Sequence, residues 1–449
     1  MTRRVDLAII GAGTAGLSAL KEAGRHTGNT LIIDPGPLGT TCARVGCMPS
    51  KALIHAARDV ASAREARARG HLAGDPPTVD IPAVLAHVRA LRDRFASVPA
   101  HSTEKLGDRY MAGHPRFLDA ETLEVNGQRI RAGRIIIATG TRPVIPATWD
   151  AVADRILTSD TLFEQMTLPP RMAVVGLGPI GLELGQALGM LGIDIQAFGQ
   201  GDRLAGLQRE DSNVALRSAL DPYMAIHTNA AVELQDAGDG VRVGWADGAV
   251  MVDRVLAAVG RRPNVECLAL EALGVPLDQR GLPPVDADTL RVGDTPVYFA
   301  GDVHGLRPLM HEAADEGVIA ARQALDSGRE SYRRTPLAIV FTEPGVTRVG
   351  MAFDDLPPGA VSASFRLSEQ GRAVLMNRPD GVLHVDADAR GRLLGAEFVA
   401  PEAEHLGHEL AWLIQQGATV DEALQLPFYH PVLEEGLRSV FQALRRQLR

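Results

Sequence analysis

The sequence predicts an α/β protein of about three domains, built on doubly wound parallel sheets. Its 449 residues allow roughly 150 residues per domain, enough for each to bury a core. A strand, a glycine-rich turn, a helix and a second strand occur in this order twice, 165 residues apart. Strands that alternate with helices are typical of parallel sheets covered by helices.

The two copies of this unit can be followed along the chain. In the first, residues 4–10 favour a buried strand, the turn GAGTAG follows, and an Ala- and Leu-rich helix extends to about His26. The next apolar run ends at Asp34. In the second copy, residues 171–176 and 193–198 are the expected strands, separated by the turn GLGPIG and a helix. We therefore expect two related βαβ units.

The rest of the chain divides by composition. Residues 50–73 and 80–96 favour helices, the first of them rich in Ala and Arg. Short β-like runs with turn signals occupy residues 228–260. After residue 334, short strands continue to about residue 399 and are followed by helices. These changes predict domain boundaries near residues 148, 252 and 335.

Composition excludes several classes of protein. The formal net charge of −9 offers no basic surface for a nucleic-acid backbone. The apolar runs are far shorter than a membrane-spanning helix, and no signal-type segment follows Met1. Three cysteines cannot form a disulfide framework in a chain of this length. We expect a cytoplasmic protein without a membrane or nucleic-acid partner.

The two glycine turns predict two dinucleotide sites. Each follows a strand and opens a helix, so its glycines permit a tight turn and the helix N-terminus offers free N–H groups to a pyrophosphate. The glycines are Gly11, Gly13, Gly16, Gly176, Gly178 and Gly181. Asp34 lies 18 residues after Gly16, where a carboxylate takes the ribose hydroxyls, but the matching residue of the second turn is Gly199. Tight turns without a ligand are the alternative; two unlike dinucleotides suggest a resident flavin and an exchanging nicotinamide.

Two cysteines, Cys42 and Cys47, lie just beyond the first unit in the segment GTTCARVGCMPSK. In a regular helix, residues five apart are separated by a rise of about 7.5 Å and point about 140° apart, which is unsuited to a disulfide. The thiols can pair only if the segment bends, as Gly46 and Pro49 favour. A thiol near a helix N-terminus is a better nucleophile. Two inert buried thiols or half of a metal site are the alternatives. Other possible metal ligands are too scattered in the sequence, so no metal is expected.

Together, these motifs resemble those of the FAD-dependent pyridine nucleotide-disulfide oxidoreductases of class I, the group of dihydrolipoyl dehydrogenase, glutathione reductase and mercuric reductase. The matches extend over nearly the whole chain in the family's order. Besides the two glycine turns and the cysteine segment, they are ATG at 138–140, GRRPN at 260–264, FAGD at 299–302, HEAADEG at 311–317, FTEP at 341–344 and HPVLEE at 430–435.

The resemblance implies two Rossmann-like dinucleotide-binding domains, one for FAD and one for NAD(P), and an α+β C-terminal dimerisation domain. The FAD-binding domain would comprise residues 1–148 and 252–335. The NAD(P)-binding domain would be inserted at 149–251, and the dimer-interface domain would be 336–449. Members of the family are homodimers whose active sites combine residues of both subunits.

The resemblance also assigns the redox centre. Cys47 would face the flavin as the charge-transfer thiolate, and Cys42 would exchange with the sulfur of the substrate, so that the two form the redox disulfide. Lys51 would lie near flavin N5 and pair with Glu183. Lys51 is one of only three lysines in a chain with 43 arginines, and a guanidinium could not replace a compact ammonium at a stacked flavin edge.

His430 and Glu435 would form the family's catalytic base pair and act on the cysteines of the other subunit. Residues five apart lie on different faces of a helix, so a contact between them requires His430 to precede the helix, as Pro431 favours. The carboxylate would fix the imidazole tautomer and raise its basicity for taking and returning thiol protons.

Cofactor contacts are implied in the same way. Those to FAD would come from Gly11, Gly13, Gly16, Asp34, Thr41, Lys51, Thr139, Gly140, Asp302, Met310 and His311, with Asp302 at the ribityl chain and the adenine near His114 or Pro115. The nicotinamide dinucleotide would use Gly178, Gly181, Val232 and Gly260.

The choice of nucleotide and substrate depends on departures from the family pattern. Gly199 lacks the acid of NAD-binding relatives, and Gln200 and Gly206 replace the arginines of NADPH-binding ones. We expect NAD(H) rather than NADP(H), because no cationic pair is visible. The motif MPSK favours a dihydrolipoyl dehydrogenase-like enzyme acting on a small dithiol or a lipoyl domain, and no second cysteine pair supports mercuric reductase. An NAD(P)H-dependent reductase of glutathione or another small disulfide, and a flavin redox sensor with little turnover, are the alternatives.

Overall fold

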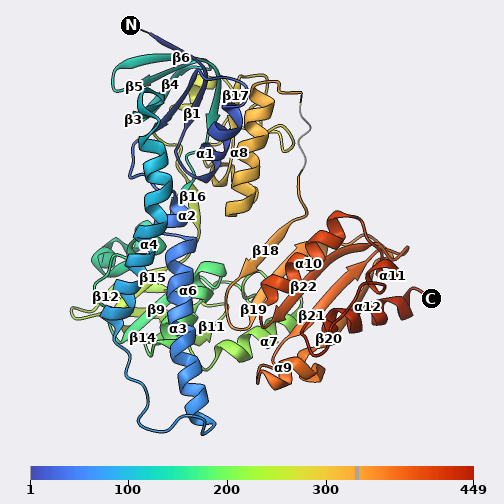
Figure 1. Cartoon of the computed structure of the whole chain (residues 1–449). Coiled ribbons are helices and arrows are strands. Elements are labelled where there is room, and N and C mark those ends of the chain that lie inside the picture. Colours follow the sequence, from blue (N-terminus) through green and yellow to red (C-terminus); the bar gives the residue numbers. More distant parts are fainter. Residues whose placement is uncertain (1, 329–332) are drawn as a thin grey trace.

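The structure, a computed structural model, describes residues 2–328 and 333–449 and comprises three units (Figure 1). The first lies at the top of Figure 1, the second below it, and the third, in orange and red, beside the second. The main sheet of the first unit is mostly parallel, that of the second is wholly parallel, and both are covered by helices, whereas the third unit has an antiparallel sheet with helices on it. The predicted fold class is therefore confirmed.

The first unit is built on a sheet in the order β3-β2-β1-β6-β5-β4, with β17 pairing with β6. Residues 7–10 of β1 are fully or almost fully buried, as expected for a central strand covered on both faces. Helices α1 and α8 pack against each other beside this sheet. The bounds are β1 Arg3–Ile10, α1 Thr14–Ala23, β2 Thr30–Asp34, β3 Tyr110–Ala112, β4 Pro115–Asp119, β5 Thr122–Val125, β6 Gln128–Ile137, β17 Val297–Phe299 and α8 Met310–Ala324.

The second unit has a parallel sheet in the order β11-β10-β9-β15-β8 and a small antiparallel sheet, β12-β13-β14. Strand β15 lies between β9 and β8, so this sheet extends past the boundary expected near residue 252, because the chain re-enters the parallel sheet after the β13–β14 hairpin. The bounds are β8 Ile156–Thr158, α5 Ser159–Leu162, β9 Arg171–Val175, α6 Pro179–Met190, β10 Asp194–Phe198, α7 Glu210–Leu220, β11 Ala225–His227, β12 Glu233–Asp236, β13 Val241–Trp245, β14 Gly248–Val252 and β15 Arg254–Ala257.

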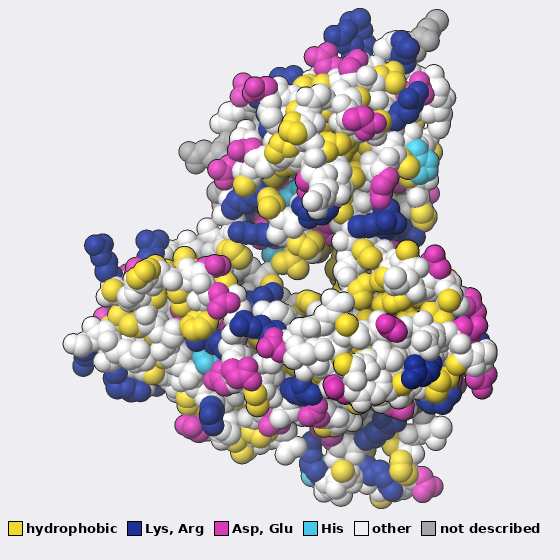
Figure 2. Space-filling view, turned by 180° about the vertical axis from the view of Figure 1, so that it is seen from behind, with side chains coloured by type: hydrophobic (Ala, Val, Ile, Leu, Met, Phe, Trp, Pro, Cys, Tyr) yellow, Lys and Arg dark blue, Asp and Glu magenta, His cyan; other side chains and the backbone are white. Residues whose placement is uncertain are grey.

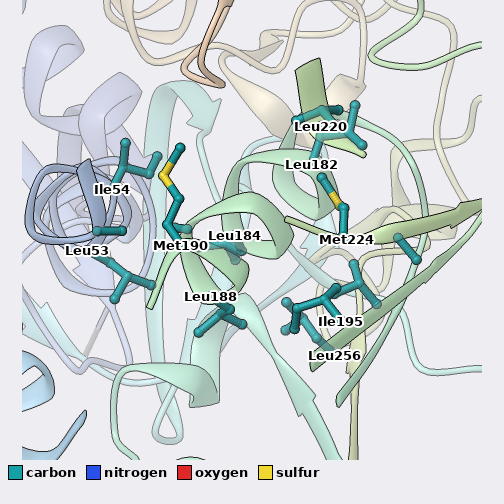
Figure 3. Packing of buried hydrophobic residues seen from close by; sticks show 14 of the residues in the cluster. Leu53, Ile54, Leu182, Leu184, Leu188, Met190, Ile195, Leu220, Met224 and Leu256 are labelled. Carbon is teal, nitrogen blue, oxygen red and sulfur yellow. The ribbon is translucent and has the colours of Figure 1, made fainter. Parts of the chain in front are cut away.

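Strand pairing and helix packing join these units. Strands β7 (Thr141–Pro143) and β16 (Arg261–Pro263) pair antiparallel where the chain leaves and re-enters the first unit. Helix α3 (Cys47–Ala68) packs against α6 of the second unit, and Figure 3 shows Leu53 and Ile54 of α3 beside residues of α6 in one buried cluster. The first unit is thereby anchored to the second through the helix that begins at the second cysteine.

The long helices differ from the sequence prediction at their ends. Helix α3 begins at Cys47, three residues before the predicted start, after the short helix α2 (Thr41–Arg44). Helix α4 (Ile81–Glu104) continues beyond residue 96 and past Pro99. The buried Thr103 side chain donates to the Pro99 carbonyl at 3.0 Å, which fixes this last turn.

The third unit has an antiparallel sheet in the order β18-β19-β22-β21-β20. Helix α10 packs on β19 and β22, and α12 packs on β20 and β21. The bounds are β18 Leu337–Val340, β19 Gly345–Gly350, β20 Val361–Arg366, α9 Gly371–Leu375, β21 Val382–Ala387, β22 Leu393–Ala400, α10 Ala403–Gln415, α11 Val420–Ala423 and α12 Glu435–Gln447. Within residues 2–328 and 333–449, none of the helices combines the length and apolar character needed to cross a bilayer.

Candidate active site

A cavity of about 1540 Å³ lies where the three units meet. Figure 2 shows a hollow between the upper and lower parts of the molecule, with basic side chains along its edge. The cavity wall contains the predicted residues Gly11, Gly13, Asp34, Thr41, Cys42, Cys47, Lys51, His114, Pro115, Thr139, Gly140, Glu183, Gly260, Asp302 and Met310. The other predicted residues lie outside its lining: Gly16, Gly178, Gly181, Val232, His311, His430 and Glu435.

The first glycine turn has little room for side chains. A Cβ at Gly16 would lie 1.9 Å from the Gly11 carbonyl oxygen, so the turn and helix α1 approach as closely as their backbones allow. At the end of β2, the Asp34 carboxylate accepts hydrogen bonds from the N–H groups of Ala12 and Gly36, each at 2.6 Å. Each carboxylate oxygen keeps a lone pair that can accept a ribose hydroxyl.

The wall of the cavity fits the FAD that the fold implies. The Thr139 hydroxyl is buried and, within the described part of the chain, has no hydrogen-bond partner, so it is available to a bound group. Asn264 Nδ2 donates to the Thr139 carbonyl at 3.0 Å and fixes this turn. Space is open at the Cα atoms of Gly13 and Gly140, where a dinucleotide backbone can approach.

Asp302 and the start of α8 form a further part of the wall. Burial raises the pKa of the Asp302 carboxyl, and the nearby Arg261 guanidinium opposes this. Met310 is the first residue of α8, so the free N–H groups of that helix face the cavity, as those of α1 do. His311, the second residue of α8, is exposed and does not line the cavity.

A buried network that sequence reasoning missed holds the turn before Asp302. Glu316 of α8 is fully buried and bonds to the Gly301 N–H at 2.8 Å and to His304 Nε2 at 2.6 Å. Its other carboxylate oxygen lies 2.6 Å from Arg333 Nη1. Burial raises the pKa of Glu316, but these partners outweigh that effect and keep it below its usual range. In the sequence, Glu316 is one of the acidic residues of the motif HEAADEG, and the motif does not reveal the partners of its carboxylate.

The cysteine segment bends as pairing of the thiols requires. Helix α2 ends at Arg44 and α3 begins at Cys47, so the two cysteines lie in different helices. A Cβ at Gly46 would lie 3.3 Å from the Cys42 Cα and 3.1 Å from the Thr41 carbonyl oxygen, so the bend is tight. Cys42 and Cys47 are free, half-buried thiols, and each is the largest influence on the pKa of the other. The bend thus brings together two sulfur atoms that a regular helix would keep apart.

The two thiols are electrostatically unlike. The hydrogen bond from Cys42 lowers the pKa of Cys47 to about 7, with a further contribution from the Lys51 ammonium. The same hydrogen bond, together with burial, raises the pKa of Cys42. Of the two, Cys47 is therefore the thiolate near neutral pH.

Lys51, one turn along α3 from Cys47, is held in place from the second and third units. Its Nζ lies 2.7 Å from Glu183 Oε2 and 4.6 Å from the centre of the Phe341 ring. The other oxygen of Glu183 accepts the Phe341 N–H at 2.9 Å. The predicted partners are thus in contact, and Phe341, which lies in the FTEP motif, is an additional contact that was not predicted.

His430 lies on the surface of the third unit. The residue precedes α12, as its predicted contact requires, and its Nδ1 lies 3.0 and 3.1 Å from the two carboxylate oxygens of Glu435. The hydrogen bond with His430 lowers the pKa of Glu435. The imidazole is 82% exposed, and it does not share the cavity of its own subunit's cysteines. The predicted contact between His430 and Glu435 is therefore present, and the other ring nitrogen of His430, Nε2, is available to a partner.

The residues expected to bind the nicotinamide dinucleotide lie in or beside the second unit. Gly178 caps the N-terminus of α6, and a Cβ at Gly181 would lie 1.8 Å from the Gly176 carbonyl oxygen. Val232 is half-buried against a cluster of buried apolar residues. Gly260 has open space at its Cα and lines the cavity. Their binding role stays a prediction.

Two dinucleotide folds that converge on a pair of adjacent thiols define a redox enzyme with a dithiol centre. The chain belongs to the pyridine nucleotide-disulphide oxidoreductase family, whose model matches residues 5–317. The model of that family's dimerisation domain matches residues 337–440. The protein is accordingly an FAD-dependent disulfide oxidoreductase with a dimerisation domain.

Full-length relatives carry the name dihydrolipoyl dehydrogenase. The chain is 31% identical to that of Haloferax volcanii over 457 residues, which covers 96% of the chain and 94% of the relative. It is 30% identical to that of Thermus scotoductus over 454 residues, 98% of each. Among solved structures, LpdA of Mycobacterium tuberculosis matches with a TM-score of 0.86 at 27% identity, over 98% of this chain and 99% of that one. The HOCl-induced flavoprotein disulfide reductase RclA of Escherichia coli shares the fold, with a TM-score of 0.84 at 23% identity over 97% and 99%.

Proposed function

We propose that the protein transfers two electrons between a dithiol and NAD(H) through FAD and a Cys42–Cys47 disulfide. The expected dithiol is dihydrolipoamide or a lipoyl domain, as the names of the relatives suggest. The observation that carries the proposal is the pair of thiols that the bend between α2 and α3 brings to the cavity wall, where the neighbouring Cys42 lowers the pKa of Cys47 to about 7. When bound, FAD would supply the link between this dithiol centre and the nicotinamide.

Thiol–disulfide exchange gives the two cysteines distinct roles. A thiolate of the substrate attacks the Cys42 sulfur of the oxidised pair, and Cys47 leaves as the thiolate, which its lowered pKa favours. The second thiol of the substrate then displaces Cys42 and closes the substrate disulfide. The substrate loses two electrons and the cysteine pair gains them. Lys51 lies one turn along α3 and stabilises the resulting Cys47 thiolate electrostatically.

The proton of the attacking thiol would pass to His430 of a second subunit. The matching dimerisation domain supports a homodimer, and the exposed imidazole is free to reach another subunit. Glu435 would hold the ring in the tautomer with a free nitrogen and stabilise the imidazolium. We expect the enzyme to work in the reducing cytoplasm.

Steady-state rates test the proposal. Purified holoenzyme should reduce NAD⁺ with dihydrolipoamide faster than it reduces glutathione disulfide or cystine with NADPH. The second candidate is an NADPH-dependent reductase of a small disulfide, and the acid-free position Gly199 is the observation in its favour. No turnover of dihydrolipoamide would overturn the proposal, and negligible turnover with every pair would favour the redox sensor.

A further inference from the structure

The two glycine turns have nearly the same backbone, so their residues can be compared one by one. The N–H of the first glycine donates at 2.8 Å to the carbonyl of Ile33 in the first turn and of Phe198 in the second. The first helical hydrogen bonds are 2.9 and 3.0 Å long, and a Cβ at the third glycine would meet the first glycine's carbonyl at 1.9 or 1.8 Å. Corresponding residues are 165 apart throughout.

At two corresponding positions, the larger and the smaller side chain are interchanged between the two turns. The first turn has the small Ala12 and the acidic Asp34, whose carboxylate accepts the Ala12 N–H at 2.6 Å. The second has the large Leu177 and Gly199. A Cβ at Gly199 would lie 2.6 Å from Leu177 Cδ1 and 2.8 Å from its Cγ. Leu177 is only 6% exposed, so its side chain fills the space into which an acid at position 199 would have to extend.

This exchange removes the usual discrimination at the ribose. A carboxylate at the strand end accepts the 2′-hydroxyl of NAD(H) and repels the 2′-phosphate of NADP(H), whereas leucine does neither. Arg203 follows the end of β10 by five residues, and its guanidinium already has partners within the described part of the chain. Arg203 Nη1 donates to the carbonyls of Leu207 and Gln208 at 3.5 and 3.2 Å and lies 3.7 Å from Asp354 Oδ2.

We propose that Leu177 and Gly199 together determine nucleotide specificity and leave the second site almost indifferent to a phosphate on the adenosine ribose. The inference rests on the proposed function, in which this site binds the nicotinamide dinucleotide. It replaces the expected preference for NAD(H) by comparable rates of electron exchange with NADH and NADPH, and it makes the apolar side chain of Leu177 a specificity determinant.

Binding of nucleotide fragments tests the inference without catalysis. Calorimetric titration of the holoenzyme with 5′-AMP and with adenosine 2′,5′-bisphosphate should give dissociation constants within about fivefold of each other. The double variant Leu177→Ala/Gly199→Asp copies the pair found in the first turn. It should shift the ratio of the two constants at least tenfold, roughly, towards 5′-AMP. Gly199→Asp alone should shift it less, because Leu177 occupies the space, and Leu177→Ala alone should leave the ratio within about twofold.

Three results would overturn the inference. A wild-type preference of about 100-fold or more for either fragment would contradict the indifferent site, and this measurement needs no variant to fold. A full shift in Gly199→Asp alone would exclude a role for Leu177. If neither fragment binds and neither NADH nor NADPH bleaches the flavin absorbance, the proposed function fails with it. Binding of the two fragments with strong discrimination between them would refute the inference but leave the proposed function standing.

Discussion

The difference in pKa between the two active-site thiols has a direct chemical consequence at the scale of single residues. Cys47 is stabilised as a thiolate chiefly by the hydrogen bond from Cys42. In reduced holoenzyme carrying Cys267→Ser, a further Cys42→Ser change keeps a hydroxyl donor, so alkylation of Cys47 by iodoacetamide should rise with a midpoint near pH 7. Cys42→Ala removes the donor, and the midpoint should move up towards the ordinary thiol value of 9.0. Mass spectrometry of the alkylated peptide gives both profiles, and equal midpoints would refute the assigned cause.

His430 offers a second test at this scale. His430→Gln removes the base and keeps a polar side chain beside Glu435. Turnover of dihydrolipoamide should slow about 10²- to 10³-fold, whereas stopped-flow reduction of the flavin by NADH should stay within about twofold of wild type. If both reactions slow equally, His430 does not act in the thiol half of the reaction.

The residue pairs of the site show which contacts can be predicted from the sequence and which cannot. The contacts Lys51–Glu183 and His430–Glu435 could be inferred because all four residues lie in motifs of the family, the first pair in two motifs and the second pair in one. The bond between Phe341 and Glu183 could not, because a backbone N–H donates it and any residue type except proline could stand there. The pKa difference between the thiols also needed coordinates, since it depends on which sulfur donates to the other.

At the scale of elements, the two glycine turns provide a matched pair of variants. Gly16→Ala and Gly181→Ala place a Cβ 1.9 and 1.8 Å from a backbone carbonyl oxygen, a contact that only a backbone shift can relieve. Gly16→Ala should release FAD during gel filtration. Gly181→Ala should keep FAD and lose its reduction by NADH. Flavin absorbance of the eluted protein and stopped-flow reduction separate the two effects, and loss of FAD from Gly181→Ala would contradict the assignment of the two units.

The buried Glu316 network predicts a coupling between α8 and the flavin site. Glu316→Gln weakens charged hydrogen bonds to His304 and Arg333, which should lower the free energy of unfolding by about 1.5–3 kcal/mol and weaken FAD binding. Glu22→Gln is the control, because Glu22 is also buried and paired with arginines but does not contact the turn before Asp302. Thermal unfolding and flavin fluorescence measure the two quantities. Equal loss of FAD in both variants would mean that Glu316 acts only through stability.

Elements were predicted best where their pattern is local. The strands at 4–10 and 193–198 follow from apolar runs bounded by glycine turns, and β1 and β10 begin and end within one residue of them. The boundary near 252 was placed too early, because the apolar run that forms β15 follows a hairpin directly and nothing local assigns it to a sheet. The network of Glu316, His304 and Arg333 joins residues 12 and 17 positions apart, which no helical or strand periodicity relates.

At the scale of the whole molecule, the proposed mechanism requires active sites shared between subunits. A homodimer of Cys42→Ser and one of His430→Gln should each turn over dihydrolipoamide poorly. After dissociation and reassociation of an equal mixture, about half of the dimers are mixed, and each mixed dimer has one intact site. Activity should therefore recover to about a quarter of wild type. No recovery, with mixed dimers verified by native mass spectrometry, would place His430 in the same subunit's site or outside catalysis.

Anaerobic stopped-flow spectroscopy of the flavin in wild type and Cys42→Ser shows directly whether electrons pass through the Cys42–Cys47 pair. Dihydrolipoamide should bleach the flavin absorbance of the wild-type holoenzyme within the time of one turnover and should fail to do so in the variant. NADH should bleach both proteins at similar rates, because its route to the flavin does not use the thiols. Bleaching of the Cys42→Ser flavin by dihydrolipoamide at the wild-type rate would contradict the account.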